Sequence, residues 1–122
     1  MRILVVDDEK SLYLARFILE KNGYEVIEAR DGLEAVDKAS RESPDLILMD
    51  MQLPELDGYE ATRRIKADEK LSKVPVIALT AYAMKGDREK TIDAGCSGHI
   101  EKPIDPVTFA EYIKKFLEVT AL

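Results

Sequence analysis

The chain has 122 residues, of which 46% are hydrophobic and 34% charged, a composition typical of one globular domain and not of a disordered segment. Its net charge of -6 at pH 7 disfavours a nucleic-acid-binding surface, because such a surface needs clustered Lys and Arg. One cysteine and no apolar run of the ~18–20 residues that a membrane span needs predict a cytoplasmic protein. We expect a single domain over residues 1–122 with no internal disulfide and no direct contact with membrane or DNA.

Five short apolar runs alternate with longer charged segments of helical period. The runs, which predict strands, are Ile3–Val6, Glu25–Glu28, Leu46–Met49, Val76–Leu79 and Ser97–Ile100. The helical segments are expected at about Ser11–Lys21, from Asp31 to before Pro44, after Asp57-Gly58, at about Gly86–Ala94 and from Pro106 onward. Three of the runs are continuously apolar, which is typical of strands buried on both faces of a parallel sheet. The second and fifth runs are more polar and are expected at the edges of the sheet.

Local signals mark where the helices begin and end. Asn22-Gly23 predicts the end of the first helix. Asp31 is a good N-cap for the second helix, and Asp105-Pro106 places an N-cap before a proline at the first helical position of the fifth. The fifth helix also carries an inward apolar stripe, formed by Phe109, Ile113, Phe116 and Leu117.

Strict alternation of strands and helices predicts an α/β fold, a doubly wound parallel sheet with helices on both faces. In such a sheet the functional cleft lies beyond the carboxyl ends of the strands. Asp7 and Asp8 follow the first run, Asp50 the third, Thr80 the fourth and Lys102 the fifth. If the first and third strands are neighbours, three carboxylates meet at one edge and face a hydroxyl and an amine.

Three clustered carboxylates raise one another's pKa values unless something compensates their charge. Mg²⁺ is a natural compensation, since it binds carboxylates together with retained waters and phosphate oxygens. Lys102 would then supply a compact positive charge for a phosphate group. The chemistry predicted for this edge is the transfer of a phosphoryl group to Asp50 as nucleophile.

Four segments resemble those of the receiver domain of two-component response regulators, in the same order and at similar separations. They are VVDDE at Val5–Glu9, LILMDMQLPELDG at Leu46–Gly58, VIALTA at Val76–Ala81 and EKPI at Glu101–Ile104. The resemblance extends over essentially the whole chain and is closest to chemotaxis-type regulators. It implies a flavodoxin-like fold, a five-stranded parallel sheet of strand order 2-1-3-4-5 with five helices.

The resemblance also implies a magnesium site and a phosphorylation site. Asp50 is the expected phosphorylated residue. Asp8 and Asp50 would bind Mg²⁺ through their side chains and Gln52 through its backbone carbonyl, while Asp7 would act through a bound water.

Three further roles follow from the family. Lys102 would contact the phosphoryl oxygens, and its peptide bond to Pro103 is expected to be cis. Thr80 would donate its hydroxyl to the phosphoryl group and start the conformational switch. The family has Tyr or Phe at the position of His99, so this histidine either turns inward as the switch residue or is an exposed edge residue with no such role.

The expected partner is a sensor histidine kinase or a histidine phosphotransfer domain, and the expected output surface comprises the fourth helix, fifth strand and fifth helix.

The first helix carries more apolar residues than one buried stripe needs. We expect Leu14 and Ile18 to face the core, with Leu12, Ala15 and Leu19 forming a second stripe beside the acidic site. This stripe is either a docking surface or part of a wide core face. The docking candidates are Ser11, Leu12, Ala15, Pro103 and Ile104.

Three other functions fit the sequence less well. A flavin-binding electron carrier of the same fold would need a Ser-, Thr- and Gly-rich loop after the first strand, where this chain has acidic residues. A hydrolase of the haloacid dehalogenase kind would need a DxD pattern there and a cap segment. A receiver used only for binding would not need the full set of site residues.

We expect a non-enzymatic phosphoacceptor, either a stand-alone regulator or an excised receiver. We also expect slow self-dephosphorylation, because the bulky Tyr82 would shield the site.

Overall fold

The computed structural model describes residues 1–7, 10–53, 55–81 and 85–120. Five strands form one parallel sheet in the order β2-β1-β3-β4-β5. The strands are β1 (Arg2–Val6), β2 (Glu25–Ala29), β3 (Leu46–Asp50), β4 (Val76–Thr80) and β5 (Gly98–Glu101). The helices are α1 (Lys10–Lys21), α2 (Gly32–Glu42), α3 (Gly58–Ala67), α4 (Lys85–Ala94) and α5 (Pro106–Thr120). The predicted doubly wound fold, its strand order and its two edge strands are confirmed.

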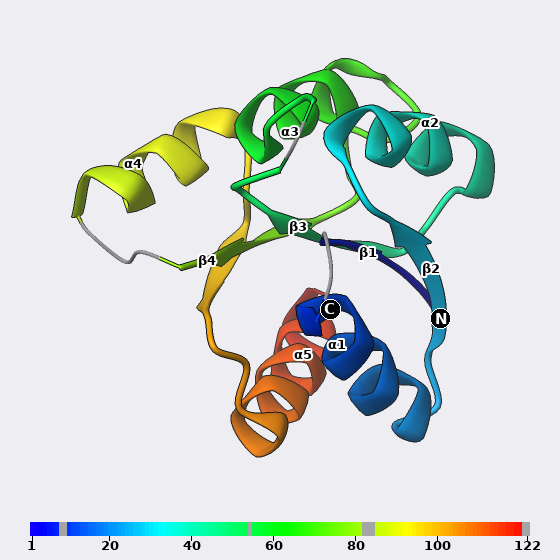
Figure 1. Ribbon diagram of the computed structural model, residues 1–122. Helices are drawn as coiled ribbons and strands as arrows, with labels where there is room; N and C mark the ends of the chain where they lie inside the picture. The colour runs from blue at the N-terminus through cyan, green and yellow to red at the C-terminus, as the bar shows by residue number, and fades with distance from the viewer. Residues whose placement is uncertain (8–9, 54, 82–84, 121–122) are drawn as a thin grey trace.

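The sheet lies between two helical layers (Figure 1), with α1 and α5 on one face and α2, α3 and α4 on the other. Alternate residues of β1 supply the two halves of the core: Ile3 and Val5 pack with α1 and α5, whereas Leu4 and Val6 pack toward α2 and α3. Every residue of β3 and of β4 is buried, as expected for central strands covered on both faces. No helix in the described part of the chain has the length and apolar character to cross a bilayer.

Aspartate side chains cap two of the helices, at the predicted N-cap of α2 and at the residue before α3. Asp31 accepts a hydrogen bond from the backbone N–H of Glu34 at 2.8 Å and caps α2. Asp57 caps α3 in the same way, accepting from the N–H of Glu60 at 2.9 Å. The turn after α1 contains Gly23 with φ 88°, a left-handed conformation that glycine adopts without a steric penalty.

The register of the sheet brings the predicted site residues to one edge. Val6 is paired with Met49, so Asp7 follows β1 beside Asp50 at the end of β3. At the other side of β3, Asp50 is paired with Leu79, and Thr80 is paired with Glu101. Lys102 directly follows Glu101, so its side chain starts from the same edge of the sheet.

Candidate functional site

An amine and two carboxylates form the centre of the site. Lys102 Nζ lies 3.0 Å from Asp7 Oδ2 and 3.1 Å from Asp50 Oδ2. Asp7 is fully buried and Asp50 is 5% exposed, so both acidic groups have left bulk water. A charged hydrogen-bond donor between two buried carboxylates offsets part of the free-energy cost of burying them together. The predicted convergence of residues 7, 50 and 102 is present in the structure.

The two carboxylates determine the charge state of the lysine. Burial lowers the pKa of Lys102, but the hydrogen bond to Asp7 and the attraction of Asp50 more than offset that effect, so its pKa is raised. The amine is therefore a fixed positive charge at neutral pH, which a ligand for phosphoryl oxygens requires.

The second oxygen of Asp50 has a different partner, which the sequence did not reveal. Asp50 Oδ1 accepts a hydrogen bond from the backbone N–H of Gln52 at 3.0 Å, while Oδ2 faces Lys102. The two contacts fix the orientation of the carboxylate. For the backbone of Gln52, sequence reasoning named the carbonyl and not the N–H, because a backbone N–H contact leaves no side-chain signature.

Thr80 contributes a hydroxyl at the same edge. The residue is 6% exposed, and its Oγ1 forms no hydrogen bond within the part of the chain that the structure describes. A buried hydroxyl without a partner costs free energy, so such groups often serve a ligand or a functional state. The position of Thr80 agrees with its predicted role as a hydrogen-bond donor toward a group attached to Asp50.

A glycine allows the loop after β3 to turn closely over the site. A Cβ atom at Gly58 would lie 2.3 Å from the carbonyl oxygen of Asp50 and 2.6 Å from Met51 Cα. The N–H of Gly58 also donates to the carbonyl of Met51 at 3.2 Å. The start of α3 therefore packs directly against the backbone of the residue that carries the central carboxylate.

The donor set suits a hard divalent cation. Asp7 and Asp50 place carboxylate oxygens at the same edge, and Mg²⁺ prefers such oxygens together with waters and a phosphate group. Across the described ranges, no cluster of three or more His, Cys, Asp or Glu side chains is present. The third predicted carboxylate, Asp8, lies outside these ranges. The two described carboxylates fit a magnesium site.

Two family-based expectations concern the segment around β5. The peptide bond between Lys102 and Pro103 is cis, as expected. His99 lies on β5 opposite Ala78, two residues before the pairing of Thr80 with Glu101, and its side chain is half-buried. His99 therefore lies near the predicted switch threonine, Thr80. The role of His99 in switching stays a prediction.

The predicted orientation of α1 is confirmed in part: Ile18 lies in the core as expected, and the stripe beside it belongs to a wide core face, the second of the two alternatives, whereas Leu14 was misplaced. Leu12 is 2% exposed and Ala15 fully buried, and both belong to the core on the α5 side of the sheet. Leu14, expected in the core, is 36% exposed, and its neighbours Tyr13 and Phe17 are also exposed. The helix packs through the stripe at positions 12, 15, 18 and 19, so the helical period turns the other apolar residues to its surface.

The burial of these residues decides which of the five docking candidates can meet a partner. Leu12 and Ala15 are not available to a partner, and Ile104 is only 7% exposed because it packs in the same core. Pro103 is exposed. The side chain of Ser11 lies outside the described part of the structure.

Comparison with known proteins agrees with this geometry. The family model of the response regulator receiver domain matches residues 3–114. The polar-differentiation response regulators DivK of Brucella ovis and Brucella anthropi are each 50% identical to this chain over 115 residues, 94% of this chain and 94% of each relative.

Solved structures give the same result. The receiver domain of the sensor histidine kinase PA1611 from Pseudomonas aeruginosa is 40% identical with a TM-score of 0.88, and the match covers 96% of this chain and 97% of that one. That structure has a magnesium ion coordinated in its active-site cleft. The chemotaxis response regulator CheY4 of Vibrio cholerae is 28% identical with a TM-score of 0.89, covering 93% of this chain and 96% of that one. The present chain therefore belongs to the family of response regulator receiver domains.

Proposed function

We propose that Asp50 accepts a phosphoryl group from a phosphohistidine of a sensor kinase or phosphotransfer domain, in a reaction that depends on Mg²⁺. The contact of one half-buried amine with both Asp7 and Asp50 is the observation that carries this proposal. The arrangement combines a nucleophilic carboxylate, a fixed cation and a hydroxyl that has no hydrogen-bond partner among the described residues, all at one edge of the sheet. The match to a family whose members act as phosphorylated regulators supports the assignment.

The reaction forms a bond between a carboxylate oxygen of Asp50 and phosphorus and breaks the bond between phosphorus and the donor imidazole nitrogen. The imidazole leaves with the electron pair of that bond and takes up a proton. Asp8, Asp50 and the carbonyl of Gln52 would hold Mg²⁺, with Asp7 acting through a bound water, and the ion would supply neutralisation of charge on the phosphoryl oxygens. Lys102 shifts its hydrogen bonds from the carboxylates to the transferred oxygens, and the N–H of Gln52 keeps the carboxylate oriented.

Phosphorylation is read by the residues on the next strands. Thr80 donates its hydroxyl to the phosphoryl group, and His99 on the neighbouring strand follows its movement. The added negative charge then shifts an existing equilibrium on the α4, β5 and α5 surface. The protein acts as a signalling switch and not as an enzyme on small substrates.

The acyl phosphate is expected to decay slowly without a partner. Gln52 is exposed beside Asp50, and Tyr82, the residue proposed to shield the phosphoryl group, lies outside the described residues. The decay of the phosphorylated protein by mass, compared between wild type and Tyr82→Ala, tests this shielding. A variant that decays no faster than wild type argues against it.

Incubation with Mg²⁺ and acetyl phosphate, followed by intact mass measurement, tests the proposal directly. The wild type is expected to gain the mass of one phosphoryl group, and Asp50→Ala to gain none. Asp37→Asn is the matched control, since this exposed aspartate on α2 pairs only with Arg41 at 2.7 Å. Modification of Asp50→Ala at the wild-type rate, or its absence from the wild type with both acetyl phosphate and a phosphorylated kinase, would rule out the assignment.

A further inference from the structure

β5 leaves one side of its backbone without a strand partner. Within the described part of the chain it pairs only with β4, and it lies at the edge of the sheet between α4 and α5 (Figure 1). In a parallel ladder, alternate residues direct their N–H and C=O groups to opposite sides. About half of the main-chain groups of Gly98–Glu101 therefore face away from β4. Such an edge is a template for another extended chain.

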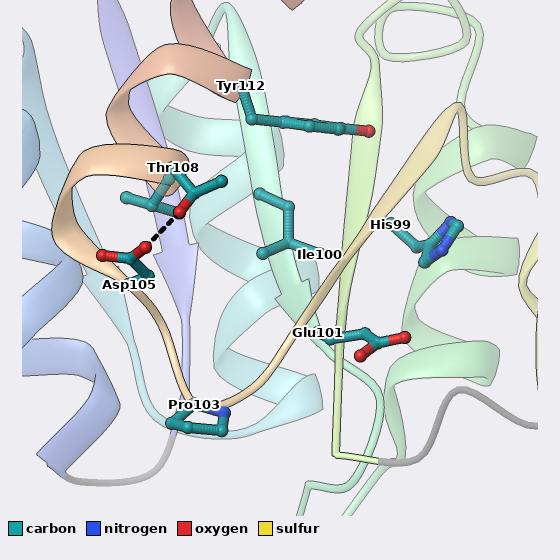
Figure 2. A pocket seen from close by; sticks show the side chains of 8 residues that line it. His99, Ile100, Glu101, Pro103, Asp105, Thr108 and Tyr112 are labelled. Atoms are coloured by element: carbon teal, nitrogen blue, oxygen red, sulfur yellow. Dashed lines mark hydrogen bonds between the residues drawn. The ribbon is translucent and has the colours of Figure 1, made fainter.

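Two hollows flank this edge. The first, about 320 Å³, lies between β5 and α5, with its floor formed by Ile100, Phe109 and Tyr112. The second, about 280 Å³, lies between β5 and α4 and is lined by Ile92 and Cys96 among others. Figure 2 shows Ile100 and Tyr112 on one side of the strand and His99 on the other. A strand added to the edge would direct its successive side chains alternately into these two hollows.

A glycine keeps the α5-side hollow in its present shape. A Cβ atom at Gly98 would lie 2.4 Å from the hydroxyl oxygen of Tyr112, so the tyrosine ring approaches the bare backbone of β5. The ring of Tyr112 is also stacked on Phe116, with centroids 6.4 Å apart. The apolar wall of the hollow is therefore held by packing from α5 and not by a loop.

The charge at the α5-side hollow selects the kind of occupant. Glu101 on β5 and Asp105 before α5 both line it and are exposed; in Figure 2 the Asp105 side chain lies on the α5 side, and that of Glu101 lies on the same side of the strand as His99. Within the described residues, the Glu101 carboxylate has no ion pair or hydrogen bond, whereas Asp105 accepts hydrogen bonds from Thr108 Oγ1 and from the N–H of Val107. An apolar floor with carboxylates at the rim fits a long side chain that ends in a positive charge.

The opposite edge of the sheet differs in this respect. On β2, Glu28 binds Arg16 at 2.6 Å and Glu25 lies 3.5 Å from Arg2, so its acidic groups are already paired within the chain. Only the β5 edge offers unpaired acidic charge next to apolar hollows, among the described parts of the two edge strands.

We propose that the β5 edge binds an extended segment of another protein as a sixth strand, with a Lys or Arg side chain in the hollow between β5 and α5. A second copy of this chain is a poorer occupant, since its own edge strand, Gly98–Glu101, carries no Lys or Arg to enter the hollow. The binding itself requires no phosphorylation. Phosphorylation of Asp50 would regulate it through His99, which lines both hollows, and this regulation rests on the proposed function.

A peptide array provides the test. Peptides with the core Thr-Val-X-Val-Thr, where X is each standard residue, are probed with the full chain without phosphodonor. Lys and Arg at X are expected to bind best, roughly threefold to tenfold above norleucine in solution titrations. Hydrogen exchange of the β5 amides should slow on binding of the Lys peptide. No enrichment of Lys and Arg at X would overturn the proposal.

Two controls separate strand addition from other modes of binding. N-methylation of alternate peptide amides removes the main-chain donors and should abolish binding; unchanged affinity would exclude a sixth strand. The double variant Glu101→Gln with Asp105→Asn, which preserves a capping side chain on α5, should lose the preference for Lys over norleucine. Glu25→Gln on β2 should keep it. Dimerisation of the free chain with protected β5 amides would identify a second copy as the occupant and contradict the proposal.

The following comparisons test this proposal separately from the proposed function. Asp50→Ala should bind the Lys peptide as the wild type does when no phosphodonor is present. If the wild type is phosphorylated but no Lys or Arg peptide binds, the β5 assignment fails and the phosphoacceptor assignment stands. If the Lys peptide binds but Asp50 accepts no phosphoryl group, the β5 assignment stands and the phosphoacceptor assignment fails. A change in peptide affinity on phosphorylation, absent from Asp50→Ala, would support the regulation.

Discussion

Lys102 stabilises the fold as well as the site. Its amine compensates two buried carboxylates, and removing it leaves Asp7 and Asp50 close together without a counter-charge. We expect Lys102→Met to lower the free energy of unfolding by about 2 kcal/mol near neutral pH, the usual contribution of hydrogen bonds to charged groups. Urea denaturation of the two proteins measures the difference.

The pH dependence of that difference follows from the raised pKa of Lys102. A group whose pKa is higher in the folded state stabilises the protein below its unfolded value and loses that contribution as the pH rises through the folded value. The wild type and Lys102→Met should therefore differ by a constant amount near neutrality and converge above the ordinary lysine pKa of 10.5. Lys114→Met, on the exposed surface of α5, should show no such convergence. A difference that grows with alkaline pH would contradict the assigned contacts.

Gly58 controls the position of the Asp50 backbone. Because a Cβ atom there would lie 2.3 Å from the Asp50 carbonyl oxygen, Gly58→Ala must shift the backbone on one side. We expect a loss of about 1–3 kcal/mol in stability, as for other overpacked sites, together with slower phosphoryl uptake. Gly23→Ala is the control: its Cβ would meet nothing within 4 Å, and its cost of about 1 kcal/mol comes only from the left-handed backbone at φ 88°. Equal uptake by both variants would show that the close approach is not needed for the site.

The rotation of α1 gives a prediction for a whole helix. Leu12 and Leu14 are two positions apart, but Leu12 is 2% and Leu14 is 36% exposed. We expect Leu12→Ala to cost about 3 kcal/mol, a typical value for a buried leucine, and Leu14→Ala below about 1 kcal/mol. Urea midpoints of the two variants provide the measurement. Equal losses would mean that the helix presents a different face to the core.

The same helix shows where sequence reasoning reached its limit. In α5 the apolar residues lie on one stripe, so the pattern correctly identified Phe109 and Ile113 as core residues. In α1 apolar residues lie on two stripes, and the hydrophobic period then fixes the helix but not its rotation. Packing against α5 and β1 decides the rotation, and these long-range contacts are not encoded in a local pattern. Two docking candidates on α1, Leu12 and Ala15, were wrong for this reason.

The site itself was more predictable than the helix that borders it. Polar residues at the ends of apolar strands are expensive to bury, so the charged residues at three strand ends and the threonine at a fourth indicated convergence at one edge. The parallel register then brought the Lys102 amine within 3.1 Å of a carboxylate oxygen of both Asp7 and Asp50, as expected. The N–H contact of Gln52 and the close approach of Gly58 involve backbone atoms, so no residue pattern could indicate them.

Across the whole domain, the proposed function requires that a signal pass from the middle of the sheet to its edge. Asp50 lies on the central strand, Thr80 on the next, and His99 on the edge strand between the two hollows. The sheet separates the core into two halves, and β5 contacts both of its flanking helices. Movement of one side chain on β5 can therefore change the shape of the surface on both sides.

The identity of residue 99 should set the strength of this coupling. An imidazole buries less apolar area than a phenol ring when it turns inward, so His99→Tyr is expected to favour the inward, phosphorylated state by roughly 1 kcal/mol, about a fivefold change in the population ratio. Amide chemical shifts of α4 and β5, recorded with and without acetyl phosphate, measure the shift for each protein. His99→Gln, which removes the ring but keeps a polar side chain, should show no gain over wild type, and Asp50→Ala gives the background. If phosphorylated wild type and His99→Tyr show the same shift, residue 99 does not transmit the signal and Thr80 must act through another contact.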